Sequence, residues 1–581
     1  MMRQYHHMKR EHPDTLLFFR LGDFYEMFYE DAVLASRELE ITLTSRNTDR
    51  TGTPIPMCGV PYHSVNNYLA RLIKKGYKVA ICEQVEDPHL ATGIVRREVT
   101  RIVTPGTVIE EGVLNSRENN FMSSLFEIEE RVGASFLDLS TGQFMLTEFS
   151  GAQAWGQMQQ ELLHFQPREV IIPEGDHEQF CARIPGDLKT SAVRSPQSDW
   201  IFHLDYAQRI LLEHFRVSTL EGFGLNGQKA AISAAGALLH YVKETQKSSV
   251  AHITRLNVLE PADHLTLDES TIENLELIQG LDGNKRWTLL ATLDLSKTAM
   301  GARLLRAWML RPSLKIAEIE QRLGAVQELH QSVIAMGRLA KILKSIQDLE
   351  RLLSRVTLET ANARDLLALK DSLARLPELS RRLEAYRSVL LRCDLDLLKD
   401  VVELLGRAIA EDPPITLNEG GLIQAGFHAE LDELREIATS GKSFIASLES
   451  QEREKTGIPS LKVKYNKVFG YFIQVTKTHL ESVPPHYIRK QTLVGCERFI
   501  TPELKEYEEK VLTAEERIHG LEKDLFVEVR RQVAEQARRI QQAAQTIARV
   551  DVLLALAEVA KKNHYVRPQL DESQELLIRG G

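Results

Sequence analysis

One proline-free segment near the carboxyl end limits the folds that this chain can adopt. Thr501-Pro502 is a helix-start signal, a capping residue followed by a first-turn proline, and no proline follows until Pro568. Apolar residues recur along the segment at helical spacing. One helix across it would be on the order of 90 Å long at ~1.5 Å per residue. Such a helix cannot lie inside one compact domain, so it bridges domains or pairs as a coiled coil, with Gly520 as a candidate soft point.

The composition excludes several classes of protein. A chain of 581 residues is expected to form about three to five domains, and 43% hydrophobic with 26% charged residues suits buried cores in a soluble protein. No apolar run approaches the ~20 residues of a membrane helix, and the start lacks the apolar stretch of a signal peptide. Five scattered cysteines form neither a zinc pattern nor a disulfide framework. We therefore expect a cytoplasmic protein.

The first 230 residues are predicted to form two α/β units. In residues 1–107, apolar spacing predicts a helix over 64–76, capped by Ser64 and ended near Gly76, and the run 79–82 predicts a buried strand. In residues 108–230, segments 134–139 and 144–147 flank a turn as in a hairpin. A helix near 152–165 and a strand at 169–172 follow.

From about residue 231 the pattern changes to long helices. A different segment interrupts them, because residues 460–465 and 471–475 alternate like strands around a Phe469-Gly470 corner. The segment is also basic: residues 461–500 hold seven Lys or Arg against two acids, although the whole chain has a formal net charge of −9. Residues 68–101 hold seven against four. The overall charge is thus mild evidence against a nucleic-acid binder but hides two basic regions.

Residues 22–28, Gly-Asp-Phe-Tyr-Glu-Met-Phe, predict a turn followed by a strand. In a strand, Phe24, Glu26 and Phe28 share one face, with Tyr25 and Met27 on the other. Taken alone, this pattern most often belongs to core packing. At the end of a hairpin, however, a ring beside a carboxylate can insert between stacked bases and accept a hydrogen bond from a base edge.

The motifs that follow in order give this hairpin a context. They are segments 54–63, 68–69, 79–88 and 101–107. Together with residues 22–28 they resemble the amino-terminal mismatch-recognition domain of the bacterial MutS family of DNA mismatch repair proteins. The resemblance continues to the last residue, through lever signatures at 274–277 and 300–308 and clamp and lever signatures at 470–474 and 502–508.

The resemblance implies a multidomain fold of α/β and all-α parts: two amino-terminal α/β domains, then a long-helix core and lever interrupted by a small β-rich clamp. The implied domains are mismatch recognition, 1–107; a ribonuclease H-like connector, 108–230; helical core and lever, 231–428 and 499–558; clamp, 429–498; and the start of the ATPase domain, 559–581. Because the family would be entering its ATPase domain there, we expect a fragment that lacks most of that domain.

The resemblance also implies roles for single residues. Phe24 and Glu26 would contact the mispaired base from the minor groove. Unstacking a base step costs a few kcal/mol, least where pairing is faulty, so a wedge tests deformability rather than sequence. Candidate backbone or groove contacts are Met57, Tyr62, His63, Arg96 and Arg101. Candidate phosphate contacts in the clamp are Arg489, Lys490, Gln491 and Arg498, with the arginine fork favouring Arg489 and Arg498.

The expected partners and cofactors also come from the family. They are duplex DNA with mismatches or small loops, a second copy in a homodimer, and a MutL-type matchmaker that binds partly through the connector. ATP and Mg²⁺ would drive conversion to a sliding clamp in the full-length protein, which is expected in the cytoplasm at the nucleoid.

The chain itself shows no catalytic site. Its one Gly-Lys-Ser, at 441–443, has Glu436 rather than glycine five residues before Gly441 and helical flanks, so it is not a phosphate-binding loop. No cofactor or metal site is predicted, and the chain is expected to be inactive as an enzyme. Asp138 lacks the carboxylate partners of a nuclease and is expected to be a surface or turn residue.

Two other functions stay open at this point. A non-catalytic coiled-coil scaffold with protein partners would share the long helix but lack the steep salt dependence of a DNA clamp. A nuclease would need Mg²⁺-dependent cleavage, and the missing carboxylate cluster disfavours it.

Overall fold

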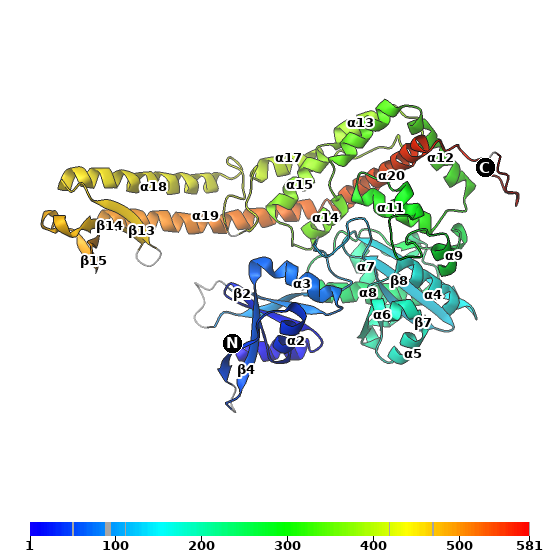
Figure 1. The fold of residues 1–581 in the computed structure, drawn as a ribbon, viewed down its shortest axis with the longest axis horizontal. Coiled ribbons are helices and arrows are strands. Elements are labelled where there is room, and N and C mark those ends of the chain that lie inside the picture. Colours follow the sequence, from blue (N-terminus) through cyan, green and yellow to red (C-terminus); the bar gives the residue numbers. More distant parts are fainter. Residues whose placement is uncertain (49–51, 87–93, 111, 418, 467–469, 580–581) are drawn as a thin grey trace. The chain divides into compact units, whose positions relative to one another are not determined.

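The computed structural model describes residues 1–48, 52–86, 94–110, 112–417, 419–466 and 470–579. The chain forms two compact units. The first comprises Met1–Ala361, Asp371–Lys399 and Val533–Gly581, and the second comprises Asn362–Lys370 and Asp400–Gln532 (Figure 1).

The first unit begins with a six-stranded sheet in the order β3-β4-β2-β1-β5-β6. Its strands are β1 (Leu16–Leu21), β2 (Phe24–Phe28), β3 (Thr44–Thr48), β4 (Pro54–Pro61), β5 (Val79–Gln84) and β6 (Arg97–Val103). Only the β1–β5 pair is parallel among these neighbours. Three helices accompany the sheet: α1 (Met2–Glu11), α2 (Tyr29–Leu39) and α3 (Val65–Lys74).

Both faces of this sheet are covered, as a continuous apolar strand requires. Leu16 and Phe18 of β1 lie in one core cluster together with α2 and α3. The alternate residues Leu17 and Phe19 lie in a second cluster with α1. The predicted helix and buried strand are confirmed as α3 and β5. The predicted cap differs, because the Ser64 hydroxyl donates to Pro61 O at 3.2 Å instead of accepting from the helix.

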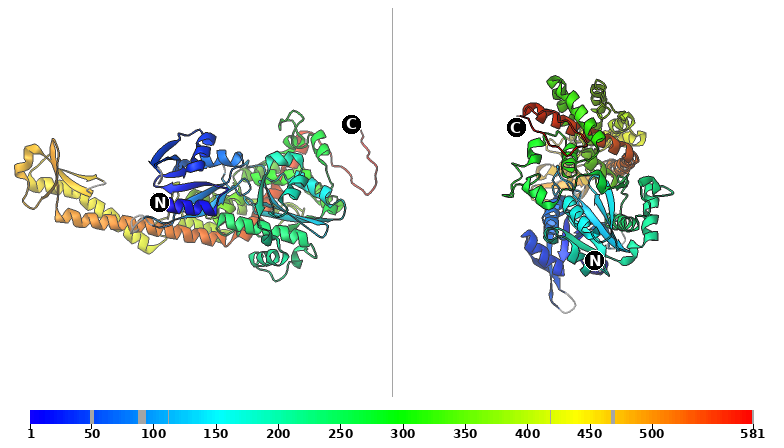
Figure 2. Two further views of the ribbon diagram at one scale, coloured as in Figure 1. Left: turned by 90° about the horizontal axis from the view of Figure 1, so that it is seen from below. Right: turned by 90° about the vertical axis from the view of Figure 1, so that its right-hand side faces the viewer.

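A second sheet follows, in the order β11-β10-β7-β8-β9-β12. Its strands are β7 (Met122–Ile128), β8 (Arg131–Asp138), β9 (Gln143–Ser150), β10 (Glu169–Pro173), β11 (Val193–Gln197) and β12 (Asn257–Val258). Its helices are α4 (Ala154–Phe165), α5 (His177–Arg183), α6 (Gly186–Ser191), α7 (Leu204–Phe215) and α8 (Lys229–Gln246), and Figure 2 shows the sheet among them. The predicted hairpin is confirmed as β8–β9.

Helix α8 belongs to this second α/β part. It lies close to β8, where a Cβ atom at Gly133 would be 2.2 Å from the Ala230 backbone. It also lies close to α7, where a Cβ atom at Gly236 would be 2.3 Å from Cα of Ala207. The connector limit expected at residue 230 therefore falls inside α8. The sequence predicted long helices from about residue 231 but not the sheet on which α8 packs.

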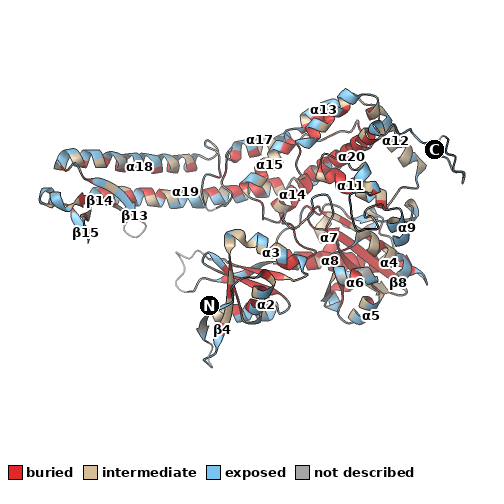
Figure 3. Ribbon diagram, in the orientation of Figure 1, coloured by how far each residue is buried: buried red, intermediate tan, exposed pale blue. Residues whose placement is uncertain are grey.

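The rest of the first unit is helical. Its helices are α9 (Glu269–Asn274), α10 (Leu289–Leu293), α11 (Ala299–Leu310), α12 (Ile316–His330), α13 (Val333–Lys344), α14 (Leu349–Thr357), α16 (Leu376–Leu383) and α20 (Ala537–Lys562). Helix α20 packs against α11, α12, α13 and α14 and is buried along most of its length (Figure 3). Helix α15 (Ala363–Leu373) crosses between the units.

The second unit is an antiparallel pair of long helices with a small sheet. The helices are α17 (Lys399–Ala408), α18 (Ala429–Thr456) and α19 (Pro502–Ala534), and the strands are β13 (Lys462–Asn466), β14 (Gly470–Thr476), β15 (Ile488–Thr492) and β16 (Cys496–Ile500). The sheet order is β13-β14-β16-β15, with antiparallel neighbours. Phe444 of α18 stacks on Tyr507 of α19, with centroids 3.7 Å apart. Phe469 of the predicted corner lies outside the described residues, whereas Gly470 has φ +73°.

The carboxyl-terminal segment forms two helices rather than one. The start at Pro502 is confirmed, with Thr501 Oγ1 accepting from Leu504 N at 3.2 Å. The break lies between α19 and α20, where Gln536 N donates to Val533 O at 3.0 Å in a tighter turn, and Gly520 stays inside α19. Neither residue between the helices is glycine or proline, and the break lies close to the point where the sequence passes from the second unit to the first. The predicted fold class is confirmed.

Candidate nucleic-acid interface

The β1–β2 hairpin exposes one aromatic ring. Phe24 is 46% exposed at the start of β2, while the other four residues of this strand are buried. Tyr25 and Met27 pack in the cluster with α2 and α3, and Phe28 packs in the cluster with α1. A strand with a core on both faces is rigid, so the ring at its end has a fixed support.

Glu26 lies near Phe24 but is far less accessible, at 9% exposed. Phe24, Glu26 and Phe28 are paired with Pro61, Gly59 and Met57 of β4. A Cβ atom at Gly59 would lie 3.5 Å from Cγ of Glu26 and 3.8 Å from Cδ1 of Phe24. The ring and the carboxylate thus flank one bare backbone position on the predicted common face.

The burial of Glu26 differs from the outward position expected for it. Its strand is flanked by β1 and β4 and is therefore internal to the sheet. The Phe28 end of the common face is covered by α1, and the Phe24 end is open. Glu26 stands between the covered and the open end. Alternation along a strand predicts the face but not how far the covering helix extends.

The candidate backbone or groove contacts in residues 1–107 fall into two groups. Tyr62 lies beside the hairpin, where its N–H donates to Asp23 O at 3.0 Å, and His63 next to it is exposed. Met57 is half-buried on β4. The two arginines are farther along the sheet on β6 or just before it, and both are paired: Arg96 with Glu98, and Arg101 with Glu110 at 2.5 Å.

In the sheet formed by β13, β14, β16 and β15, which is the expected clamp, cross-strand pairing places four polar residues in one row. Lys462, Gln474, Arg498 and Gln491 are successive partners on β13, β14, β16 and β15. Arg498 donates to Gln491 Oε1 at 2.8 Å, and its guanidinium lies 4.4 Å from the Phe472 ring centroid. Lys462 and Gln474 were not among the predicted contacts. Period-two alternation along β13 and β14 is the signal that could have identified them.

The other two clamp candidates lie beside this row. Arg489 is exposed but forms an ion pair with Glu497 at 3.1 Å. Lys490 is exposed at the irregularity where the β15–β16 register shifts. Of the four predicted clamp contacts, Gln491 and Arg498 are therefore the two that the structure joins to each other.

The chain matches known protein families and proteins along its sequence. Models of three successive MutS domains match the chain: MutS domain I over residues 1–112, MutS domain II over 120–254 and MutS domain III over 270–557. The chain is 48% identical over its whole length to the DNA mismatch repair proteins MutS of Solibacter usitatus, Symbiobacterium thermophilum and Myxococcus xanthus. The chain belongs to the MutS family.

This MutS-family chain spans about two thirds of the length of these relatives, covering 67%, 67% and 65% of them. Residues 441–443, the Gly-Lys-Ser sequence, lie inside helix α18 and not in a strand-to-helix loop. Within the described ranges, no cluster of three or more His, Cys, Asp or Glu side chains is placed to hold a metal ion. None of the helices in the described part is long and apolar enough to cross a membrane.

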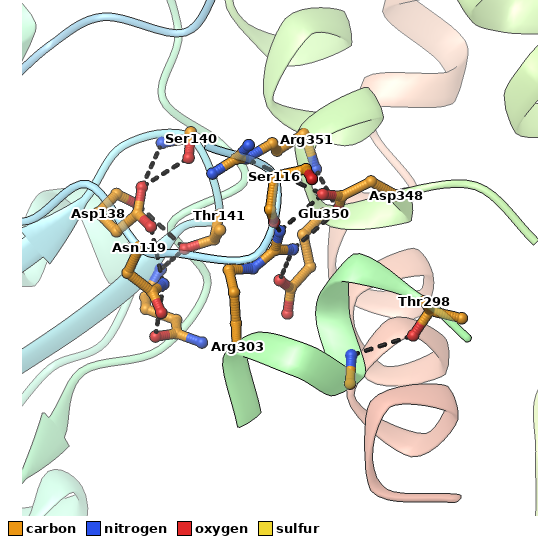
Figure 4. Close-up of polar contacts among 12 residues, drawn as sticks. Ser116, Asn119, Asp138, Ser140, Thr141, Thr298, Arg303, Asp348, Glu350 and Arg351 are labelled. Carbon is orange, nitrogen blue, oxygen red and sulfur yellow. Dashed lines mark hydrogen bonds and ion pairs between the residues drawn. The ribbon is translucent and has the colours of Figure 1, made fainter. Parts of the chain in front are cut away.

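In the region that matches MutS domain II, Asp138 is buried rather than on the surface. It ends β8, and its carboxylate accepts hydrogen bonds from Asn119 Nδ2 at 2.8 Å, Asn120 N at 3.1 Å and Ser140 N at 2.9 Å (Figure 4). These donors close the β8–β9 turn and hold the loop before β7. Asp138 is therefore a turn residue, as predicted. It does not lie on the surface, because these hydrogen bonds satisfy its carboxylate and allow it to be buried.

A buried arginine joins the loop before β7 to the helices of the first unit. Arg303 of α11 is 1% exposed and donates to Asp348 at 2.7 and 2.8 Å, to Glu350 at 2.6 Å and to Ser116 O at 2.7 Å (Figure 4). Burial raises the pKa of Glu350 despite the arginine. Burial also opposes ionisation of Asp348, but the charges of Arg303 and Arg351 and their hydrogen bonds together outweigh it and lower the pKa of that carboxyl. Sequence reasoning missed this cluster, because single charged residues in helices usually lie on the surface.

Proposed function

We propose that this chain recognises and binds mismatched or looped-out bases in duplex DNA and so initiates mismatch repair. The observation that carries the proposal is the exposure of Phe24, at 46%, on a strand whose other residues are buried. An exposed large ring on a rigid support costs hydrophobic free energy in the free protein. Insertion into a base stack would recover it. Membership of the MutS family supports the same conclusion.

Phe24 acts as the wedge in this proposal. Inserting a ring from the minor groove unstacks one base step and kinks the duplex, at a cost of a few kcal/mol. The cost is lower at a mispair or an unpaired base, since part of the stacking and pairing is already lost. Selectivity then comes from deformability, and no sequence needs to be read.

Glu26 makes the specific hydrogen bond to the mispaired base. A carboxylate close to phosphates is repelled, so it must either accept from a base N–H or become protonated and donate to a base nitrogen. Its low exposure, 9%, favours contact with a group that is pushed in beside Phe24 over contact with the outer backbone. Gly59 has no side chain that would cover the Glu26 Cγ and the Phe24 ring.

The remaining candidates position the duplex. Met57, Tyr62, His63, Arg96 and Arg101 are proposed as groove or backbone contacts. Arg489, Lys490, Gln491 and Arg498 grip phosphates, which gives affinity without sequence preference. Lys462 and Gln474 join this group because they share the row of Arg498.

Several properties extend the proposal to the whole protein. The ranges 1–107, 108–230, 231–428 with 499–558, and 429–498 are proposed as mismatch-recognition, connector, core and clamp domains. Homodimerisation, ATP- and Mg²⁺-driven sliding and binding of a MutL-type protein are proposed for the full-length protein. The nucleoid is its proposed location.

The test compares matched duplexes with duplexes that carry one mispair. Wild type is expected to prefer the mispair, and Phe24→Ala to lose this preference with a smaller loss of binding to matched DNA. Leu43→Ala is the control, since Leu43 is 45% exposed in the same domain, close to the 46% of Phe24. Equal affinity of wild type for both duplexes would contradict the proposal. Binding that does not fall as salt rises would favour the coiled-coil scaffold instead.

A further inference from the structure

The turn before Phe24 is short and depends on its neighbours. Gly22 and Asp23 alone connect β1 to β2, and Gly22 has φ +57°, in the left-handed region. Tyr62 N–H donates to Asp23 O at 3.0 Å and so ties the turn to the end of β4. The position of the Phe24 ring therefore depends on how firmly this turn is held.

Arg20, the residue before the last in β1, holds the turn from the other side. Its Nε donates to Gly22 O at 2.5 Å. The guanidinium carbon lies 3.8 Å from the ring centroid of Tyr62 and 5.4 Å from that of Tyr25. The side chain is only 17% exposed, and Nη1 lies 4.0 Å from Glu83 Oε2. One cation thus contacts the turn, the residue that ties the turn, and the strand that carries Phe24.

The groups around Arg20 are themselves fixed. The Tyr25 hydroxyl donates to Glu83, and Arg97 Nε donates to the carbonyl of Arg20 at 2.7 Å. The planar fork of arginine can stack on a ring and donate to a carbonyl at the same time. A lysine in its place keeps the charge but cannot make both contacts from one rigid group.

We propose that Arg20 is a positioning residue for mismatch recognition: it locks the turn at residues 22–23 and the ring of Tyr62 so that Phe24 is held in its inserting geometry. This inference rests on the proposed function of Phe24. A wedge must resist the base stack that it opens, and a loose turn would let the ring move aside. Removing Arg20 is therefore expected to lower the affinity of those complexes in which Phe24 is inserted.

The rival role for Arg20 is a direct phosphate contact. In that case Arg20→Lys would keep most of the function because the charge remains. Arg20→Met would weaken binding to matched and mispaired duplexes alike and would reduce the salt slope by about one. The positioning role predicts the opposite pattern, since Arg20→Lys should already impair discrimination.

The binding experiment measures affinity for matched and single-mispair duplexes at several salt concentrations. Arg20→Lys is expected to lower the ratio of the two affinities by a factor of roughly five to thirty, with matched binding and the salt slope nearly unchanged. Tyr62→Leu, which removes the stacked ring and leaves Arg20, is also expected to lower the ratio of the two affinities. In a Phe24→Ala background, Arg20→Lys should cause no further loss. Arg37→Lys is the control, because the Arg37 side chain is 72% exposed on α2 and pairs with its neighbour Glu38.

A second measurement needs no DNA. Hydrogen exchange of the Tyr62 amide, which donates to Asp23 O, should become faster in Arg20→Lys while the global unfolding temperature stays near that of wild type. Unchanged exchange, or discrimination equal to wild type in Arg20→Lys, would overturn the inference. If wild type itself fails to discriminate, the proposed function fails, and the exchange result still shows whether Arg20 holds the turn.

Discussion

Phe24 and Glu26 flank the bare backbone of Gly59, with the nearest atoms of the two side chains 3.8 and 3.5 Å from the place of a Cβ atom. Both distances are ordinary van der Waals contacts. The ring and the carboxylate therefore leave room for a small group between them, and a longer side chain at residue 59 would fill that room.

Gly59→Leu is expected to abolish preference for a mispaired duplex while the protein stays folded. The branched side chain would occupy the space in which a base edge approaches Glu26. Gly59→Ala is the control and should retain the preference, because its single methyl group fits at contact distance. Competition binding with matched and mispaired duplexes measures the effect, and a leucine variant that still discriminates would be evidence against the shared site.

Arg303→Met is expected to lower the free energy of unfolding by roughly 3–5 kcal/mol, because it leaves the buried carboxylate of Glu350 without its cation and removes one partner of Asp348. Asp348 and Glu350 both accept from Arg303, and Glu350 is 6% exposed. Chemical denaturation of the first unit measures the loss. Lys315→Met, which removes an exposed pair with Asp263 in the same unit, serves as the control and should have little effect. Equal stability of the two variants would mean that the buried cluster contributes no more than a surface pair.

His252, which lies between Leu139 and Thr357, is expected to make the stability of the first unit sensitive to acid. Its Nε2 lies 2.8 Å from Leu139 O and its Nδ1 2.7 Å from Thr357 Oγ1, and burial lowers its pKa to about 4. The unfolded chain, with an ordinary histidine, binds the proton first. Stability is therefore full above about pH 6.5 and falls as the pH drops towards 4, by roughly 3 kcal/mol in total.

His252→Gln should flatten this part of the stability profile. Denaturation midpoints measured between pH 7 and pH 4 test it, with His7→Gln as the control, since the His7 side chain is 67% exposed. A glutamine variant with the same pH slope as wild type would show that other groups cause the acid sensitivity.

Arg498→Ala is expected to weaken binding to matched and mispaired duplexes by the same factor and to reduce the salt slope by about one. Arg498 contacts Gln491 and the Phe472 ring, so its guanidinium is already oriented on the sheet. Arg489→Ala should have a smaller effect on affinity, because Arg489 is already paired with Glu497. Salt titrations on both duplexes distinguish the two variants. A selective loss on the mispaired duplex would assign Arg498 to recognition instead.

The sequence predicted those features that depend on local pattern. Helix α3, strand β5 and the β8–β9 hairpin follow from periodicity and turn residues. The family motif at residues 22–28 identified Phe24 as the candidate wedge, because the proposed role needs one particular residue at the end of a hairpin. The outward exposure of that ring was expected and is present.

Features that depend on distant packing could not be predicted in this way. The burial of Glu26 depends on the position of β2 between β1 and β4 in the sheet, and the break before α20 has no glycine or proline to mark it. The burial of Asp138 depends on donors that follow from the loop conformation at residues 119–120. Arg20 was not singled out, since its contacts with Tyr62 appear only when β1 and the end of β4 are brought together.

Photocrosslinking from residue 24 tests the central claim most directly. With p-benzoylphenylalanine in place of Phe24, irradiation of a complex with a single-mispair duplex should give crosslinks concentrated at the mispair and its adjacent step. On the matched duplex of the same sequence, crosslinks at that position should be weak. Crosslinks spread evenly along both duplexes, or none from residue 24, would contradict the account.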